Sequence, residues 1–426
     1  MSACAATSSD GGLRLRQRRH RRPTAAPHGR ARRPLRIVAA ILALVLPVAN
    51  SAEAPKLAFE YSPESDLYNQ GKAVEYFEEK FYRDHKTWAL DDLTLQEVDV
   101  LRSRALTEPV LALAAAQVLY MFAWFRPAGQ MIRSNIVAAA QMFERSIEVG
   151  GCDPVLPSEV WVESACDIRW GMSALLYQWL GETEGDDTVQ QEAFAQRADL
   201  LLQGLTQHPR FSRVRDKWKS PYHINFNSLR FPDAPSRPLW DASKVPLAMW
   251  LEQNHHIFKA ELEPLIFDPR NIFEQLRRAD GSKECLATPG GWDTVRIVRY
   301  GHWYDAFCQL APQTCELLAS RPEISNCSFV NANYQVLYPN SHLKPHFGNA
   351  PRLAAHLPVL APEPLRASMT VGGEQTLWVE GKVVVFDDTF PHAVSHWGTA
   401  PRYVLNIWFC HPCDENNAHM QTCPEA

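Results

Sequence analysis

The sequence predicts an α+β protein in which a helical N-terminal region is followed by a double-stranded β-helix, or jelly roll. Between about residues 92 and 207, apolar residues recur at i, i+3, i+4 and i+7, the spacing of one face of an α-helix. After about residue 291, short β-branched and aromatic runs are bounded by Pro, Gly, Asn and Asp, which is typical of strands and turns. At 426 residues and 46% hydrophobic content, the chain is long enough for two or three domains.

The N-terminus differs strongly in charge from the rest of the chain. Residues 1–36 hold ten Arg and one acidic residue, a net charge of +9, whereas the remainder carries −14. A basic arm alone is compatible with a nucleic-acid tail. Because phosphate contacts need clustered positive charge and the body is acidic, we expect no nucleic-acid partner.

An apolar stretch follows the basic arm. Ile37–Ala49 contains thirteen uncharged residues, fewer than the ~20 of a spanning helix and close to a signal-peptide core. We predict a basic cytosolic leader (1–36) and a signal sequence or short type II membrane anchor (37–52). Both place the body in the secretory pathway, on the lumenal side of the endoplasmic reticulum or Golgi membrane, or secreted after cleavage. An Arg-rich organelle transit peptide is the alternative.

The cysteines are compatible with a lumenal location. Nine Cys lie beyond the leader, and their spacing forms no complete zinc motif. Disulfides such as Cys152–Cys166 or Cys410–Cys413 fit this pattern, although the pairing does not follow from the sequence. The odd number leaves at least one thiol unpaired.

The helical region is expected at residues 91–210, after a short connecting segment at 55–90. Its stretches "LTEPVLALAAAQVLYMFAWF", "NIVAAAQMFERSIEVGG" and "DDTVQQEAFAQRADLLLQGLTQHP" all show the helical period. The helix pairs that end in "RSIEVGGCDP" and "LLQGLTQHP" resemble degenerate tetratricopeptide helices. The alternative is a plain helical layer packed on the following domain.

The second domain is predicted at 218–413, followed by a tail at 414–426. It opens with a segment rich in Pro and aromatic residues, and "LAMWLEQNHHIFKAELEPLI" then predicts a helix. Strands are predicted in "SFVNANYQVLYP", "RLAAHLPVL", "RASMTVGG", "QTLWVEGKVVVFDD" and "PRYVLNIWF", with a tight hairpin at "EGK" (380–382). Six to eight short strands without intervening helices favour an antiparallel sandwich or barrel, and a jelly roll closes such a sheet.

Titratable residues cluster within the predicted strands. His346 and His392 are each expected at the start of a strand, and Arg402 in the middle of the last one. Two imidazoles with open positions suit Fe(II). A guanidinium suits bidentate capture of a carboxylate, and an unpaired buried charge would be heavily penalised. Each residue alone is compatible with a structural role, but together with His356 and Asp388 they indicate a site.

The motifs "LKPHFGN…RLAAHLPV", "WVEGKVVVFDDTFPHAV", "RYVLNIWFCHP" and "FPDAPSRPLWD" resemble the aspartyl/asparaginyl β-hydroxylase family of 2-oxoglutarate-dependent oxygenases. The resemblance covers roughly 218–413 and is sharpest from 333 to 412. In the animal branch of that family, two His coordinate iron and Gly stands where other oxygenases have an acidic ligand. Gly348 fits that pattern.

The resemblance implies Fe(II), 2-oxoglutarate and O₂ as cofactor and co-substrates. It implies His346 and His392 as iron ligands and Arg402 as the residue that binds the distal carboxylate of 2-oxoglutarate. His356 is expected against the co-substrate, near the metal.

Three positions in the expected co-substrate site bear on its binding. Arg352 matches the first Arg of the family's Arg-x-Arg-x-His motif, whereas Ala354 replaces the second. Gln335 stands where a small hydroxyl residue often contacts the co-substrate. Co-substrate binding is therefore expected to be weakened or rearranged relative to the family.

The resemblance implies a dioxygenase that hydroxylates the β-carbon of Asp or Asn in secretory-pathway proteins and releases succinate and CO₂. A secreted or lumenal protein is the expected partner, with membrane contact through the apolar segment if it is uncleaved. One alternative is hydroxylation of a lipid acyl chain or another small molecule. The helical region favours a peptide, because helix pairs commonly form concave peptide-binding surfaces. The other alternative is a non-catalytic jelly-roll binding module.

Overall fold

The computed structural model describes residues 73, 92–124, 133–149, 166–183, 188–207, 209–269, 271–273, 286–287, 290–328, 330–348, 350–414 and 423. The chain divides into two units, Met1–Glu53 and Ala54–Ala426, and all the described residues belong to the second. The predicted leader (1–36), the apolar segment (37–52) and nearly all of 55–90 lie outside the described residues.

The prediction of a single-pass type II membrane protein, lumenal in the endoplasmic reticulum or Golgi, is corrected here. No helix within the described ranges is both long enough and apolar enough to span a bilayer. The segment on which the prediction rested, Ile37–Ala49, lies outside those ranges.

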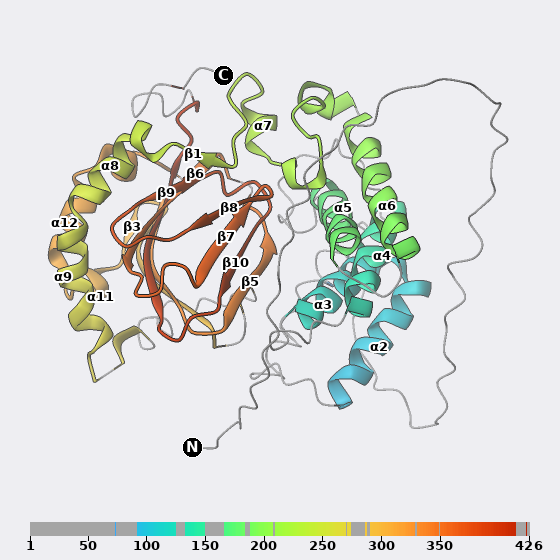
Figure 1. The fold of residues 1–426 in the computed structure, drawn as a ribbon, viewed down its shortest axis with the longest axis horizontal. Coiled ribbons are helices and arrows are strands. Elements are labelled where there is room, and N and C mark those ends of the chain that lie inside the picture. Colours follow the sequence, from blue (N-terminus) through green and yellow to red (C-terminus); the bar gives the residue numbers. More distant parts are fainter. Residues whose placement is uncertain are drawn as a thin grey trace. The chain divides into compact units, whose positions relative to one another are not determined.

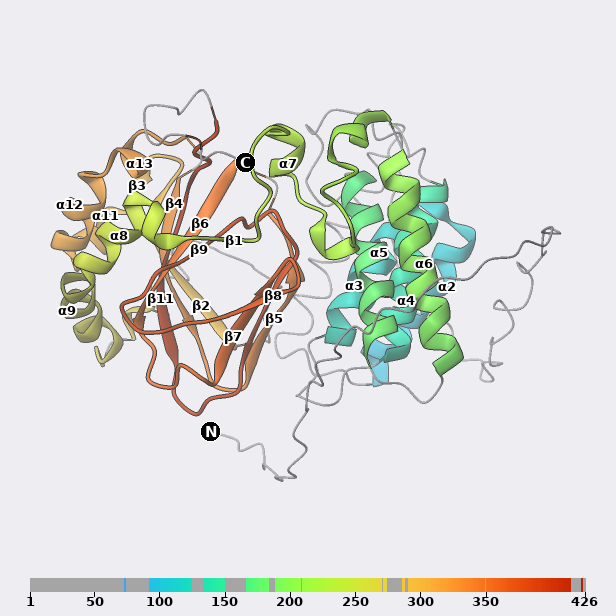
Figure 2. The same cartoon turned by 45° about the horizontal axis from the view of Figure 1, so that its top comes forward.

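Five α-helices occupy the region in which the sequence predicts helices. They are α2 (Asp92–Thr107), α3 (Ala112–Trp124), α4 (Arg133–Val149), α5 (Cys166–Glu182) and α6 (Thr188–Gln207), with a 3₁₀ turn η1 (Pro109–Leu111) before α3. Each of the helices α3 to α6 packs on the next along the chain (Figure 2). Their shared core is rich in Ala, Leu and aromatic side chains. The tetratricopeptide interpretation is not confirmed and stays a prediction.

Further helical elements follow, some before the first strand and others between strands. They are η3 (Pro209–Val214), η4 (Pro221–His223), α7 (Asn227–Arg230), η5 (Ala242–Lys244), α8 (Pro246–Gln253), α9 (His255–Ile266), α11 (Asp305–Cys308), α12 (Pro312–Ala319) and α13 (Pro322–Ser325). The single helix predicted at "LAMWLEQNHHIFKAELEPLI" is in fact two, α8 and α9. The helix is interrupted at Asn254, whose backbone leaves the helical conformation.

Eleven strands are described. They are β1 (Leu239–Trp240), β2 (Trp292–Arg299), β3 (His302–Trp303), β4 (Asn331–Leu337), β5 (Ser341–His346), β6 (Arg352–Leu360), β7 (Ala367–Val371), β8 (Glu374–Leu377), β9 (Val384–Phe386), β10 (His392–His396) and β11 (Arg402–Cys410). The described strands pair with one another in antiparallel fashion.

The strands form two sheets that enclose a common interior (Figure 1). The larger sheet has the order β1-β9-β6-β11-β4-β2-β3, and the smaller one has the order β5-β10-β7-β8. From β4 to β11 the chain passes repeatedly between the sheets, so β10 lies between β5 and β7, and β11 between β4 and β6. This order is that of an eight-stranded jelly roll, so the predicted α+β architecture is confirmed.

Two separate cores explain why the central strands read as nearly continuous apolar runs. One core lies between the two sheets and includes Met369, Trp378 and Phe386. The other joins the opposite face of the larger sheet to the helices α8, α9, α11, α12 and α13, several of which are seen together in Figure 1. β6 and β11 are therefore buried on both faces, which a pattern of simple alternation would not have revealed.

Two local predictions are wrong. The turn at 380–382 exists, with Gly381 at φ +73°, but it is not a hairpin because β8 pairs with β7 whereas β9 pairs with β6 and β1. Cys410 does not pair with Cys413. The disulfides in the described residues are Cys308–Cys315, Cys327–Cys410 and Cys413–Cys423.

Candidate functional site

The two predicted metal-binding histidines meet on neighbouring strands of the smaller sheet. His392 opens β10 and lies opposite His346 in the ladder, with their ring centroids 4.1 Å apart. His346 is the last residue of β5, not the first as expected, because the residues that precede it, from Ser341 onward, pair with β10.

Backbone hydrogen bonds fix both rings. Nδ1 of His346 lies 2.7 Å from the carbonyl oxygen of Lys344, and Nδ1 of His392 lies 2.9 Å from that of Phe390. Because a carbonyl only accepts, each Nδ1 carries the proton and each Nε2 keeps a lone pair, as a metal ligand requires. Burial lowers the pKa of His346 to about 3 and that of His392 to about 4, so both rings are neutral near pH 7.

A third ligand is not provided by the chain in the described region. No group of three or more His, Cys, Asp or Glu side chains there could hold a metal ion. Gly348 follows His346 by two residues, and a Cβ at this glycine would lie 2.6 Å from Oδ2 of Asp388. The carboxylate of Asp388 therefore fills the space that a side chain at Gly348 would need.

Arg352 holds that carboxylate in place. Its Nε and Nη2 donate to Oδ2 of Asp388 at 3.0 and 2.9 Å, and its guanidinium lies over the ring of Trp408 at 4.8 Å. The charge of Arg352 is thus already compensated within the protein. Its expected contact with the co-substrate stays a prediction.

Arg402 is the first residue of β11, not a mid-strand residue as expected. Arg402 and Val404 are two residues apart and therefore lie on the same face of β11. Val404 packs in the core between the sheets, so Arg402 faces the interior. The side chain is 4% exposed, and its Nε and Nη1 have no hydrogen-bond partner among the residues that the structure describes. Its guanidinium carbon lies 3.8 Å from the ring centroid of Trp378. Burial lowers the pKa of Arg402 to about 9, which still leaves it charged at neutral pH.

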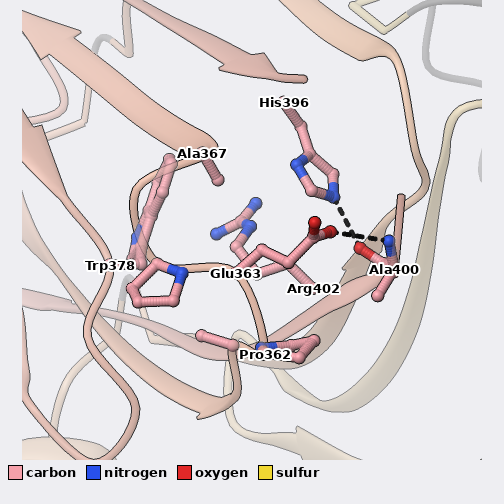
Figure 3. Close-up of a pocket in the computed structure, with 9 residues that line it drawn as sticks. Pro362, Glu363, Ala367, Trp378, His396, Ala400 and Arg402 are labelled. Atoms are coloured by element: carbon pink, nitrogen blue, oxygen red, sulfur yellow. Dashed lines mark hydrogen bonds between the residues drawn. The ribbon is translucent and has the colours of Figure 1, made fainter. Parts of the chain in front are cut away.

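A small pocket reaches Arg402 from the loops at its end of the jelly roll (Figure 3). Glu363 lines this pocket, but its carboxylate accepts the backbone N–H groups of Thr399 and Ala400 at 2.6 and 2.8 Å. No described carboxylate forms an ion pair with Arg402. The guanidinium therefore has an aromatic neighbour and lacks a protein anion among the described residues.

His356 and Gln335 lie on the larger sheet, facing the same interior. His356 lies on the same face of β6 as Ala354, which belongs to the core between the sheets. Its Nδ1 accepts a hydrogen bond from the indole N–H of Trp378 at 3.4 Å. Burial, with Arg402 and His392 nearby, lowers the pKa of His356 well below its usual value. The neutral ring then carries its proton on Nε2. Gln335 is 6% exposed and lies opposite Val404 on β11.

The structure thus brings His346, His392 and His356 together in the jelly-roll interior, and Arg402 faces the same interior. Sequence reasoning missed Trp378, which contacts both His356 and Arg402. Its signal was an aromatic residue in the run "QTLWVEGK", next to a turn.

The residues present fit a divalent metal and a carboxylate co-substrate. The two Nε2 lone pairs suit a metal such as Fe(II). The unpartnered atoms of Arg402 suit a carboxylate, because such a buried charge is stable only with an anion.

Residues 252–412 match the family model described as "Aspartyl/Asparaginyl beta-hydroxylase". The chain is 34% identical over 219 residues to human "Aspartate beta-hydroxylase domain-containing protein 2", covering 50% of this chain and 56% of that protein. It is 27% identical over 194 residues to human "Aspartyl/asparaginyl beta-hydroxylase", covering 44% of this chain and 24% of that protein.

A bacterial relative, "Ornithine lipid ester-linked acyl 2-hydroxylase" of Rhizobium tropici, is 23% identical over 187 residues, covering 43% of this chain and 64% of that protein. The chain spans about half the length of the first curated relatives that it matches. The range of the family model includes β2 to β11 and the paired histidines His346 and His392. The similarity of this chain to the aspartyl/asparaginyl β-hydroxylase family is thus shown over residues 252–412 by the family model, and the curated relatives carry related names.

Proposed function

We propose that this chain is an Fe(II)- and 2-oxoglutarate-dependent dioxygenase that hydroxylates the β-carbon of Asp or Asn residues in a protein substrate. The observation that carries the proposal is the interior of the jelly roll. Its wall holds two neutral imidazoles with open Nε2 atoms and, farther along, a buried guanidinium with unpartnered Nε and Nη1. A metal and a dicarboxylate would complement these two groups.

His346 and His392 would hold the metal through Nε2. Their carbonyl contacts lock the tautomer, so binding needs no rearrangement of the ring protons. With only two protein ligands, several coordination positions are left for the co-substrate and O₂. When bound, Fe(II) supplies the activation of O₂, which is chemistry that the side chains cannot perform.

Arg402 would pair with the distal carboxylate of 2-oxoglutarate. Its planar guanidinium offers two parallel N–H groups, and stacking on Trp378 fixes the plane in which they point. His356 would donate its Nε2 proton to a co-substrate oxygen. Ala354 offers no charge, and Arg352 is neutralised by Asp388, so Arg402 would be the principal cation for this ligand.

The overall reaction would consume O₂ and 2-oxoglutarate and release succinate and CO₂, with one oxygen atom inserted into a C–H bond of the substrate. The choice of Asp or Asn in a protein rests on the family model and on the human relatives. The helical region beside the jelly roll supports a polypeptide substrate.

An anaerobic titration of the full chain with Fe(II) and then 2-oxoglutarate tests the proposal. We expect a weak visible charge-transfer band that requires both components. Candidate peptides containing Asp or Asn should then yield succinate and a +16 Da product in air. Absence of the band together with absence of succinate would reject the enzymatic proposal and favour a non-catalytic binding module.

A second substrate class is supported by the Rhizobium tropici relative, whose name describes an acyl 2-hydroxylase of a lipid. Mass spectrometry of proteins and lipids from cells with and without the gene separates the two classes. A +16 Da product confined to the lipid fraction would replace the peptide proposal. A product confined to peptides would exclude the lipid one.

A further inference from the structure

The strand that carries His346 is weakly fixed by its own sheet. β5 is at the edge of the smaller sheet, so it has a full ladder only with β10. That ladder shifts register between His392 and Val394, next to the pairing of His392 with His346. On the opposite side, within the described part of the chain, the backbone of β5 meets the segment 286–287 through an isolated bridge from Leu343 to Ala287 and a hydrogen bond from the N–H of Lys344 to the carbonyl oxygen of Leu286. The position of His346 therefore depends on further contacts.

Those contacts come from the helical region. Tyr120 of α3 is 1% exposed, and its hydroxyl donates to the carbonyl oxygen of Pro345 at 2.7 Å. The Nζ atom of Lys344 lies 4.8 Å from the centroid of the same ring. A buried tyrosine hydroxyl thus fixes the peptide group directly before His346, 225 residues away in sequence.

The residue after His346 is held by the same region. Phe347 packs against the helical core, with its ring centroid 5.7 Å from that of Phe226. Its Cζ atom lies 3.9 Å from the position that a Cβ of Gly171 in α5 would occupy. Tyr120 therefore contacts the chain just before His346, and Phe347, just after it, packs on the core that the helices share with Phe226; none of these contacts involves His392.

We propose that Tyr120 is a positioning residue for the metal site and acts on His346 through the carbonyl group of Pro345. This inference rests on the proposed function, since it assumes that His346 and His392 bind a metal. A site with two protein ligands is sensitive to the position of each, because no third side chain compensates for a displaced ring. Supporting hydrogen bonds of ligands commonly change metal affinity measurably.

The test uses the full chain and Co(II), added anaerobically and followed by its visible absorption. Tyr120→Phe removes only the hydroxyl oxygen. Loss of one hydrogen bond should weaken Co(II) binding about three- to tenfold and change the shape of the absorption band. Phe347→Leu, which keeps an apolar side chain but loses the ring contact with Phe226, should act in the same direction.

Tyr177→Phe is the matched control. Tyr177 is also a buried tyrosine of the helical region, but its hydroxyl bonds to Glu144 within that region at 3.2 Å. This variant should keep wild-type Co(II) affinity and spectrum. Circular dichroism confirms that each variant is folded.

Unchanged Co(II) affinity and spectrum in Tyr120→Phe would overturn the inference and leave the proposed function intact. An equal loss in Tyr177→Phe would also overturn it, because the effect would then reflect the general stability of the helices. A wild-type chain that binds no Co(II) would overturn the proposed function and this inference together.

Discussion

At one end of the jelly-roll interior, His346 and His392 are neutral and each has one ring nitrogen bonded to the backbone, whereas farther along Arg402 is charged and has unpartnered guanidinium atoms. Burial acts on both groups, but with different results. An imidazole escapes the desolvation penalty by losing its proton, and it becomes a metal ligand in doing so. A guanidinium stays charged at neutral pH, so it needs an anion. One end therefore suits a Lewis acid, and the other suits a carboxylate.

The largest expected effect tests the histidine end. His392→Ala should weaken Fe(II) binding by at least about 100-fold, since it removes one of only two protein ligands. An anaerobic Fe(II) titration measures it. His342→Gln serves as the control, because the His342 ring packs at a tilt against Trp397, with the ring centroids 4.2 Å apart. Stoichiometric Fe(II) in His392→Ala would show that the metal binds elsewhere.

The arginine end should respond separately. Arg402→Lys keeps a positive charge but loses the planar fork and its stacking on Trp378. Loss of a charge-assisted hydrogen bond of ~1.5–3 kcal/mol should weaken 2-oxoglutarate binding by about one to two decades. Fe(II) affinity should be unchanged. Wild-type co-substrate affinity in this variant would make Arg402 a structural residue and would disprove the division of roles between the two ends.

The histidine end should not accept a carboxylate as a third metal ligand. In Gly348→Asp the new Cβ would meet the carboxylate of Asp388, which Arg352 holds with two hydrogen bonds. We expect about 1–3 kcal/mol of destabilisation and no gain in Fe(II) affinity. Urea unfolding and Fe(II) titration measure the two quantities. Tighter Fe(II) binding would mean that Asp388 moves away easily and that the site tolerates a three-ligand set.

The sequence revealed the polar residues of both ends, but not the contacts that join distant segments. β6 was predicted within its observed bounds because "RLAAHLPVL" is mostly apolar, and the histidines and Arg402 stood out as polar residues in or beside such runs. The turn at Gly381 was found, but a turn signal does not say which strands pair. Likewise, the bonds between Cys327 and Cys410 and between Tyr120 and Pro345 join distant segments. Such contacts follow from topology, which local patterns do not encode.

The smallest effect that we expect is a gain in stability that accompanies a loss of 2-oxoglutarate binding. Arg402→Met replaces a buried charge by an apolar side chain of similar length. It loses the contact with Trp378, worth about 0.5–2 kcal/mol, but it removes the larger penalty of an unpartnered buried guanidinium. Without 2-oxoglutarate, the variant should therefore be more stable than the wild type by about 1 kcal/mol. Urea unfolding measures this difference, and in excess 2-oxoglutarate the order should reverse, because only the wild type gains stability from the ligand.

The matched variant Trp378→Leu keeps the charge and removes its aromatic neighbour, so it should be less stable than the wild type. If Arg402→Met is less stable without the co-substrate, then the protein itself compensates the charge of Arg402, and the contrast between the two ends does not hold.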